Sequence, residues 1–208
     1  MTVRAIFFDY GGVVAKINLG KMHELERRYG IPENGMWETL FCTTDWDKVK
    51  VGRCREQTWL DNAEKRIRSM TARSIAGLKQ EWMAAWRALD HNILALVRSL
   101  QGRYRVGMIS NATIALDDEL NEHHGIGHLF NPVVNSARVQ LAKPDTRIYD
   151  LAAQQVGEDP STCLHIDDLQ PNIMGARAAG FLAVRYTGDF AALERSLLRL
   201  GIDSRPRH

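Results

Sequence analysis

Four short apolar runs in the sequence each end in side chains that can take part in chemistry. The runs have the length and the β-branched or aromatic content of buried strands. Because the carboxyl ends of parallel strands lie at one edge of a sheet, the residues that follow such runs are expected to converge there. These residues are Asp9 after 3–8, Ser110 and Asn111 after 104–109, Lys143 shortly after 132–134, and Asp167 and Asp168 after 163–166.

The types of these residues predict a site for a metal ion and a phosphate group. Carboxylates at close range repel one another unless a cation lies among them, and the set offers only oxygen ligands, which favours Mg²⁺ over softer metals. Lys143 adds a positive charge, and Ser110 and Asn111 add neutral donors near the expected start of a helix, an arrangement that suits a phosphate. Asp9, on the first strand, is placed to attack phosphorus and form an aspartyl phosphate.

Each of these pieces also has a purely structural interpretation. Asp9 fits the cap of a turn, and Ser110–Asn111 fits a turn of its own. Lys143–Pro144 fits an ordinary loop. The pair Asp167–Asp168 is harder to explain without a ligand, because two adjacent carboxylates end a buried-looking strand. The occurrence of all four pieces at successive strand ends favours an anion or metal site.

The elements that would position these residues alternate between strands and helices after about residue 102. That alternation is typical of an α/β fold with a Rossmann-like parallel sheet. Pro171 at the start of one helical pattern and Gly180 after its end mark that helix clearly. The expected helices cover 114–124, 147–156 and 171–179, and a fifth apolar run over 182–186 completes the strands.

The interval 16–101 has a different character, with helical patterns such as 19–29 and 56–70 and no convincing strand. We therefore expect two modules. An α/β core is formed by 1–15 and 102–208, and an all-helical cap is formed by 16–101, including the return helix to the core. Within the cap, the polar and aromatic segment 43–47 either contacts substrate or forms a helix-connecting turn capped by Asp45.

Composition excludes several classes of protein. The chain has 208 residues, 45% hydrophobic and 25% charged, which is typical of a globular protein. Lys and Arg number 27 against 25 Asp and Glu, and they are scattered, which argues against a nucleic-acid partner. The three cysteines lack metal-type spacing and predict neither a disulfide framework nor a zinc site. With no signal-peptide core and no apolar stretch long enough for a bilayer, we expect a cytoplasmic protein without a membrane partner.

The ordered set of motifs resembles the haloacid dehalogenase-like hydrolase superfamily over the whole chain. The first motif is 7–13 and the second is 109–112. The third is 142–145. The fourth is 165–168, followed by Asn172, Gly175–Ala176 and Ala179–Gly180. The helical insertion after the first motif resembles the mobile cap of that superfamily.

The resemblance implies a role for each site residue. Asp9 would be the nucleophile and a Mg²⁺ ligand, and the backbone carbonyl of Gly11 would be a second ligand. Asp168, helped by Asp167, would complete the protein's share of the metal coordination. Ser110, Asn111 and Lys143 would hold the transferring phosphoryl group of a small phosphorylated metabolite.

Gly11 departs from the usual pattern of the superfamily's phosphatases, which carry a general-acid aspartate at this position. Glycine has a carbonyl for a metal but no proton to give. The sequence Asp9-x-Gly11 is similar to the glucose-1-phosphate phosphatase type, which favours a sugar phosphate as the substrate.

Two other functions remain as alternatives. A 2-haloacid dehalogenase would cleave a carbon–halogen bond without metal, but that branch typically replaces the acidic pair 167–168 and has tyrosine where this chain has Gly11. A catalytically degenerate phosphate-binding or interaction protein would keep the fold without turnover. Against it, Asp9, Lys143 and both acids are all present, and folding alone would not require them.

Overall fold

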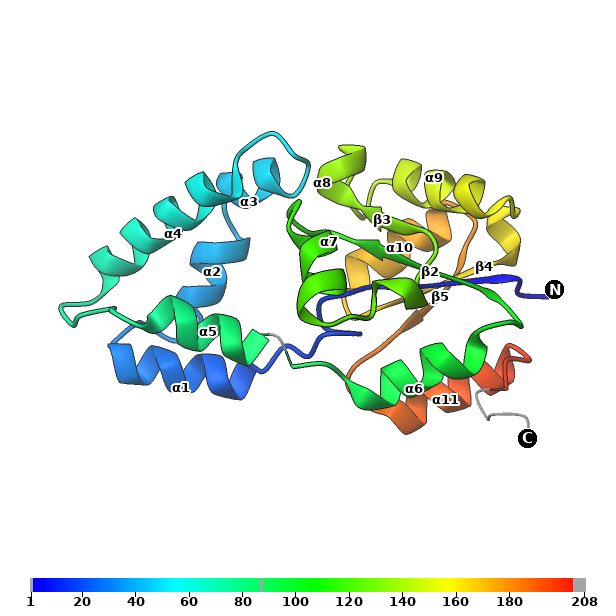
Figure 1. Cartoon of the computed structure of the whole chain (residues 1–208), viewed down its shortest axis with the longest axis horizontal. Coiled ribbons are helices and arrows are strands. Elements are labelled where there is room, and N and C mark those ends of the chain that lie inside the picture. Colours follow the sequence, from blue (N-terminus) through cyan, green and yellow to red (C-terminus); the bar gives the residue numbers. More distant parts are fainter. Residues whose placement is uncertain (1, 87, 204–208) are drawn as a thin grey trace.

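The strand β1 (Ala5–Phe8) is central in a five-stranded parallel sheet in the computed structural model, which describes residues 2–86 and 88–203 (Figure 1). The strand order is β3-β2-β1-β4-β5. The α/β fold with a Rossmann-like parallel sheet is confirmed. The other strands are β2 (Arg105–Ser110), β3 (Val133–Asn135), β4 (Cys163–Asp167) and β5 (Leu182–Arg185).

The register of the three central strands brings their carboxyl ends level. Phe8 of β1 pairs with Met108 of β2 on one side and with Ile166 of β4 on the other. Asp9 therefore leaves β1 at the height at which Asp167 ends β4. The parallel register thus places the residues after these strands at one edge of the sheet.

Helices cover both faces of the sheet, and the fully buried strand β1 shows how the faces are divided. Ile6 and Phe8 point to one face, and Ala5 and Phe7 to the other. The Ile6 face is covered by α6 (His91–Leu100) and α11 (Phe190–Arg199), below the sheet in Figure 1. The opposite face is covered by α9 (Thr146–Val156) and α10 (Gln170–Ala178). Apolar burial on both faces is the main stabilising contribution to this layered fold.

Five helices lie beside the sheet, at the left of Figure 1, and we call them the cap helices. Their apolar side chains form two clusters separate from those of the sheet, one including Leu25 and Met36 and the other including Trp59 and Ala63. α6, which follows them, packs instead with the sheet. The cap helices are α1 (Leu19–Tyr29), α2 (Gly35–Phe41), α3 (Thr44–Val49), α4 (Glu56–Met70) and α5 (Leu78–Trp86).

Local sequence signals explain where the predicted helices begin and end. Asn18 caps α1 by accepting a hydrogen bond from the Lys21 amide, and Gly30 ends it with a φ of +70°. The predicted bounds of α1 and α4 are those of the structure. α9 begins one residue earlier than predicted, and α10 begins and ends one residue earlier.

The predicted helix over 114–124 differs from the structure, which has the short α7 (Leu116–Asp118) followed by the wider turn η1 (Glu119–His123). The His124 amide donates to the carbonyl of Glu119, five residues back, and this hydrogen bond widens the last turn. The remaining short elements are η2 (Gly127–Leu129), α8 (Ser136–Val139) and η3 (Pro160–Thr162).

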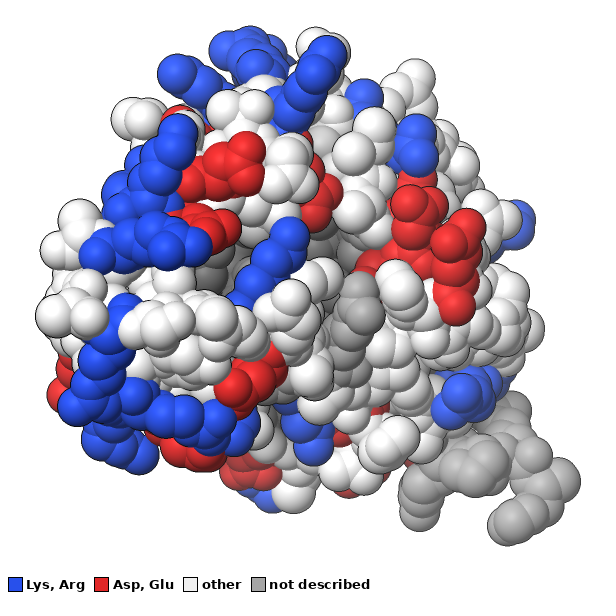
Figure 2. Space-filling model, turned by 60° about the vertical axis from the view of Figure 1, so that its left-hand side comes forward, with Lys and Arg blue, Asp and Glu red and all other residues white. Residues whose placement is uncertain are grey.

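Charged side chains of both signs lie together on the surface of the cap. In Figure 2, lysines and arginines lie beside acidic side chains, with uncharged surface between the groups. Ion pairs join several charged side chains of the cap helices, including Lys21–Glu24 and Arg68–Glu64. None of the described helices combines the length and the apolar composition that a bilayer crossing needs.

Candidate active site

Lys143 lies at the centre of the predicted site, and its side chain is fully buried. Its Nζ is 2.9 Å from Asp9 Oδ1 and 2.6 Å from Asp167 Oδ2, and it also donates to the carbonyl oxygen of Ile109 at 2.8 Å. Burial alone would lower the pKa of Lys143, but the carboxylates of Asp167 and Asp9 raise it on balance. The structure therefore joins three of the four predicted strand ends through one buried ammonium group.

Asp167 is held by a complete set of donors. Besides Lys143, its carboxylate accepts hydrogen bonds from the Leu169 amide at 2.8 Å and from Asn172 Nδ2 at 3.0 and 3.1 Å. His165 Nε2 lies 3.0 Å from Asp167 Oδ2. Burial would raise the pKa of Asp167, but Lys143 and His165 hold it well below its usual range. These contacts make Asp167 the fixed anion that positions Lys143.

The pKa values of Asp9 and Asp168 are raised, whereas that of Asp167 is lowered. Burial raises the pKa of Asp9 to about 7 against the opposing charge of Lys143, and Asp167 and Asp168 add to the rise. Burial and the Asp167 carboxylate raise the pKa of Asp168 to about 6. The surrounding described residues therefore do not fully compensate the negative charge of either group when it is ionised.

These acids fit a divalent cation. Asp9, Asp167 and Asp168 each offer a carboxylate oxygen, and the three oxygens lie within 4.8 Å of one another. Asp168 Oδ1 is buried and accepts no hydrogen bond from any described residue. An all-oxygen set with an unsatisfied carboxylate matches the ligand preference of Mg²⁺.

The two glycines of the segment after Asp9, Gly11 and Gly12, have different surroundings. Gly12 has a φ of +81°, and a Cβ added there would lie 2.3 Å from Asp168 Oδ2. A side chain at Gly12 would therefore displace Asp168. This constraint could not be predicted, because the pair Gly11–Gly12 does not show which of the two glycines adopts a positive φ. Gly11, a predicted metal ligand through its carbonyl, lines the same cavity as Asp9 and Asp168.

Ser110 and Asn111, the predicted phosphate donors, lie at the end of β2 beside Asp9. Ser110 is buried and lines the cavity with Asp9. Asn111 Nδ2 donates to the carbonyl of Lys143 at 2.9 Å, and Asn111 Oδ1 accepts from the Lys143 amide at 2.8 Å. The Asn111 side chain thus fixes the backbone that carries Lys143, a contact that its position in the sequence did not predict.

A cavity of about 420 Å³ lies over this edge, with walls from the core and from the cap helices. Its floor includes Asp9, Ser110 and Asp168, so the charged groups are accessible from it. Thr113 Oγ1 donates to Glu56 Oε2 of α4 at 2.8 Å, which joins the floor to the cap. Glu56 and Thr113 could not be predicted as neighbours of the site, because the sequence does not show how the cap helices lie over the core.

Several known proteins are similar to this chain in sequence or fold. The model of the haloacid dehalogenase-like hydrolase family matches residues 3–180. The sesquiterpene phosphatase astK of Aspergillus oryzae is 23% identical over 91% of this chain and 93% of its own length. The fructose-1-phosphate phosphatase YqaB of Escherichia coli is 33% identical, over 44% of this chain and 49% of its own.

A solved structure shows the same fold. It is the HAD family enzyme BT-2542 from Bacteroides thetaiotaomicron in complex with magnesium and inorganic phosphate, with a TM-score of 0.70 and 19% identity. The match covers 92% of this chain and 98% of that one. Together with the family match over most of the chain, this likeness means that the chain belongs to the haloacid dehalogenase-like hydrolases.

Proposed function

We propose that this hydrolase is a Mg²⁺-dependent phosphatase that cleaves a small phosphate monoester through an aspartyl phosphate on Asp9. The observation that carries the proposal is the buried Lys143 ammonium between Asp9 and Asp167, next to the unsatisfied carboxylate of Asp168. A buried cation beside a nucleophile suits the charge of a transferring phosphoryl group.

Asp9 has one oxygen held and one available for attack. Its Oδ1 accepts a hydrogen bond from the Tyr10 amide at 2.7 Å and faces Lys143. Oδ2 then forms a bond to phosphorus while the bond from phosphorus to the ester oxygen breaks, and the leaving group departs as an alkoxide or phenolate that takes a proton from water. Water hydrolyses the acyl phosphate in a second step, which releases phosphate and restores the carboxylate.

The other residues position the reacting groups. Asp167 fixes Lys143, and Asn111 fixes the Lys143 backbone. Lys143 and Ser110 would contact phosphoryl oxygens. A metal ion would be held by Asp9, Asp168 and the Gly11 carbonyl. The predicted role of Asp167 as a further metal ligand would have to compete with the hydrogen bonds that its oxygens already accept. Bound Mg²⁺ would supply positive charge to the phosphate.

The function is tested by release of phosphate and of halide, each with Mg²⁺ and with EDTA. We expect phosphate release from a panel of phosphate monoesters, loss of that release in EDTA, and no halide from 2-haloacids. Saturating Mg²⁺ should also raise the melting temperature, because a cation that binds only the folded site stabilises it by mass action.

The matched control for the metal is Asp168→Asn, which keeps the shape of the side chain but removes its charge. The stabilisation by Mg²⁺ should be much smaller in this variant than in the wild type. Halide release that persists in EDTA would support a dehalogenase instead. No release of either product would support a phosphate-binding protein without turnover.

The absence of a general acid at Gly11 gives a second expected result. A positioned acid contributes about 10²–10⁴-fold, so the wild type should cleave aryl phosphates, whose phenolate departs readily, much faster than alkyl phosphates. Gly11→Asp should raise alkyl turnover selectively. The substitution fits, because a Cβ at Gly11 meets no atom within 4 Å and the residue has no positive φ.

The control for that experiment is Gly12→Asp, which should abolish activity because its side chain would displace Asp168. Equal gains for aryl and alkyl esters in Gly11→Asp would contradict the missing-acid interpretation. The next candidate donor would then be Glu56, which lines the same cavity, and Glu56→Gln should slow alkyl esters alone.

The leaving group is a separate question. The resemblance at Gly11 favours a sugar phosphate, and one relative is a fructose-1-phosphate phosphatase, whereas a relative matched over most of its length is a sesquiterpene phosphatase. The relatives thus span polar and apolar leaving groups. The choice between them rests on the walls of the cavity.

A further inference from the structure

We propose that the leaving alcohol is mainly hydrocarbon and that it binds against an aromatic wall formed by the cap helices. This inference rests on the phosphatase function proposed above and names its substrate class. The aromatic wall consists of Trp37, Phe41, Trp46, Trp59 and Trp82, which line the cavity that contains Asp9.

The aromatic wall draws its residues from four cap helices, and four of its rings, from α2, α3 and α4, are in contact with one another. The ring centroids of Trp37 and Phe41 are 4.7 Å apart, those of Phe41 and Trp46 are 5.1 Å apart, and those of Trp46 and Trp59 are 5.3 Å apart. Edge-to-face and tilted contacts of this kind hold the rings in place. A substrate would therefore meet a preformed apolar surface.

Part of the aromatic wall is open to solvent in the free protein. Trp37, Phe41 and Trp46 are only partly buried, whereas Trp59 is 4% exposed and donates its Nε1 hydrogen to the Leu40 carbonyl at 2.8 Å. The exposed ring surface is removed from water when a hydrocarbon covers it, and this transfer favours binding.

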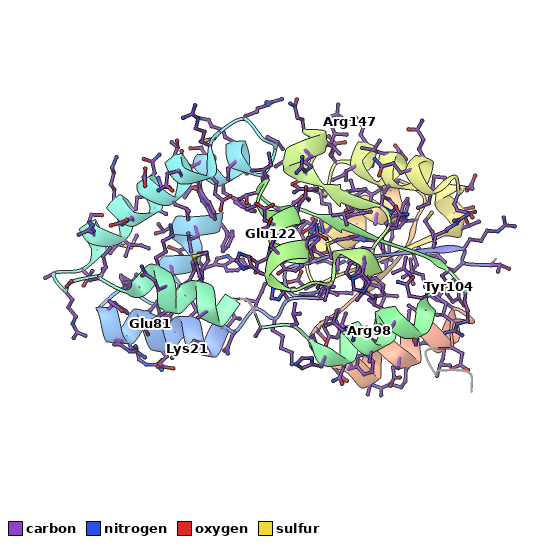
Figure 3. The ribbon with its side chains drawn as sticks, in the orientation of Figure 1. Lys21, Glu81, Arg98, Tyr104, Glu122 and Arg147 are labelled. Carbon is purple, nitrogen blue, oxygen red and sulfur yellow. The ribbon has the colours of Figure 1, made fainter. Side chains whose placement is uncertain are left out.

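Most polar groups of the cavity belong to the core. Asp9, Ser110 and Asp168 lie on the floor, where the phosphate would bind, and the other polar lining residues of the core are Asn111, Thr113, Glu119 and Asn172. Among the described residues of 16–101 that line the cavity, Glu56 is the only charged one, and it already accepts a hydrogen bond from Thr113. The charged cap residues Lys21 and Glu81 lie on the outer side of the cap (Figure 3).

This distribution disfavours a sugar as the leaving group. A sugar ring can stack on an aromatic face, but its hydroxyl groups also lose water and then need polar partners at the wall. On the side of the cap helices Glu56 is the only charged lining residue among those described, so hydroxyl groups that face the aromatic wall would lack partners there. The volume of about 420 Å³ lies within the range of sites for drug-sized ligands, about 300–1,000 Å³, and so leaves room for a ring or a branched chain beyond the phosphate.

The test compares two esters with matched skeletons, cyclohexylmethyl phosphate and glucose 6-phosphate, and a series of n-alkyl phosphates. We expect kcat/KM for cyclohexylmethyl phosphate to exceed that for glucose 6-phosphate by at least about tenfold. Along the alkyl series kcat/KM should rise about fourfold per methylene until the cavity is filled. A flat series, or equal or better cleavage of glucose 6-phosphate, would overturn the inference and leave the phosphatase function intact.

Two variants show whether the aromatic wall itself is responsible. Trp46→Ala should lower kcat/KM for octyl phosphate about tenfold and leave methyl phosphate nearly unchanged. Tyr104→Ala, an aromatic residue at the far end of the core in Figure 3, should leave both unchanged. Equal losses for octyl and methyl phosphate in Trp46→Ala would overturn the inference, because the ring would then support the fold rather than the substrate.

A binding measurement separates the failure of this inference from the failure of the phosphatase function. Tryptophan fluorescence of Asp9→Asn is titrated with cyclohexylmethyl phosphate and with glucose 6-phosphate. The tighter response is expected for the hydrocarbon ester. No phosphate release from any ester, together with tight hydrocarbon binding, would contradict only the proposed turnover, whereas equal or weaker binding of the hydrocarbon ester would contradict the substrate class.

Discussion

Asp9→Asn is expected to lower phosphate release by at least about 10³-fold, because the loss of a nucleophile costs that much or more and an amide cannot form the acyl phosphate. The substitution keeps the size of the side chain. Lys143 also keeps its partner Asp167 at 2.6 Å, so the fold should survive. Steady-state phosphate release and circular dichroism measure the two properties separately.

The pH dependence of stability distinguishes this variant from a misfolded one. Asp9 has a pKa of about 7 in the folded protein against a reference value of 3.8, so the folded state binds the extra proton between these values. The stability that depends on this proton is fully present below about pH 4 and is lost as the pH rises through 7. Asp9→Asn removes that loss.

The melting temperature of Asp9→Asn minus that of the wild type, both in EDTA, should therefore increase from pH 5 to pH 8. Ser99→Ala, on the outer helix α6, is the control. Its melting temperature minus that of the wild type should not increase from pH 5 to pH 8. Turnover of Asp9→Asn within tenfold of the wild type would remove Asp9 as the nucleophile.

Much of the site was predictable because its residues lie at or shortly after the ends of strands in a parallel sheet. Apolar runs that end in polar residues are visible in the sequence, and parallel strands bring those residues to one edge. Asp9, Lys143 and Asp167 are accordingly in contact through Lys143 Nζ. The sheet and most helix bounds were predictable for a similar reason, since periodicity and end signals are local.

Features that depend on side-chain direction were only partly predictable. The structure places His165 Nε2 3.0 Å from Asp167 Oδ2, and the two residues, two positions apart, lie on the same side of β4. The amide of Asn111 turned out to bond the Lys143 backbone. The Asn111 contact has no sequence signal, because it depends on how neighbouring segments pack, whereas the shared side of His165 and Asp167 follows from the alternation along β4.

The wall of the cavity depends on how the cap lies over the core. Segment 43–47 was expected either to contact substrate or to form a helix-connecting turn capped by Asp45. The turn was wrong, because most of the segment lies in α3, and the substrate contact stays a prediction. Thr43, rather than Asp45, caps α3 by accepting from the Trp46 amide, and Trp46 lines the cavity. Helical spacing shows that such residues are apolar on one side but not what that side faces.

Lys143→Met should produce the largest loss of stability among the site variants. The thioether fills similar space but leaves the carboxylates of Asp9 and Asp167 facing each other without a cation, and removal of one partner from a buried ion pair costs about 3–5 kcal/mol. For a chain of this size that cost corresponds to a drop of roughly 6–20 °C in melting temperature. Thermal unfolding in EDTA at pH 8 measures it.

The control is Lys65→Met, an exposed lysine on α4, which should shift the melting temperature by little. An equal shift in the two variants would mean that Lys143 has no electrostatic role in the folded site.

The loss of stability in Lys143→Met should also depend on pH, and the charges of Asp9 and Asp167 determine in which direction. Without the ammonium group, the folded-state pKa values of Asp9 and Asp167 both rise, since burial and their mutual repulsion are no longer opposed. Carboxyls with raised folded-state pKa values contribute stability that is present at low pH and is lost as the pH rises. The wild-type Lys143 keeps its charge throughout this window, because its pKa is raised above 10.5. The difference in melting temperature between wild type and Lys143→Met should therefore be smaller at pH 5 than at pH 8, and a difference that is constant or larger at pH 5 would contradict the charge arrangement of the site.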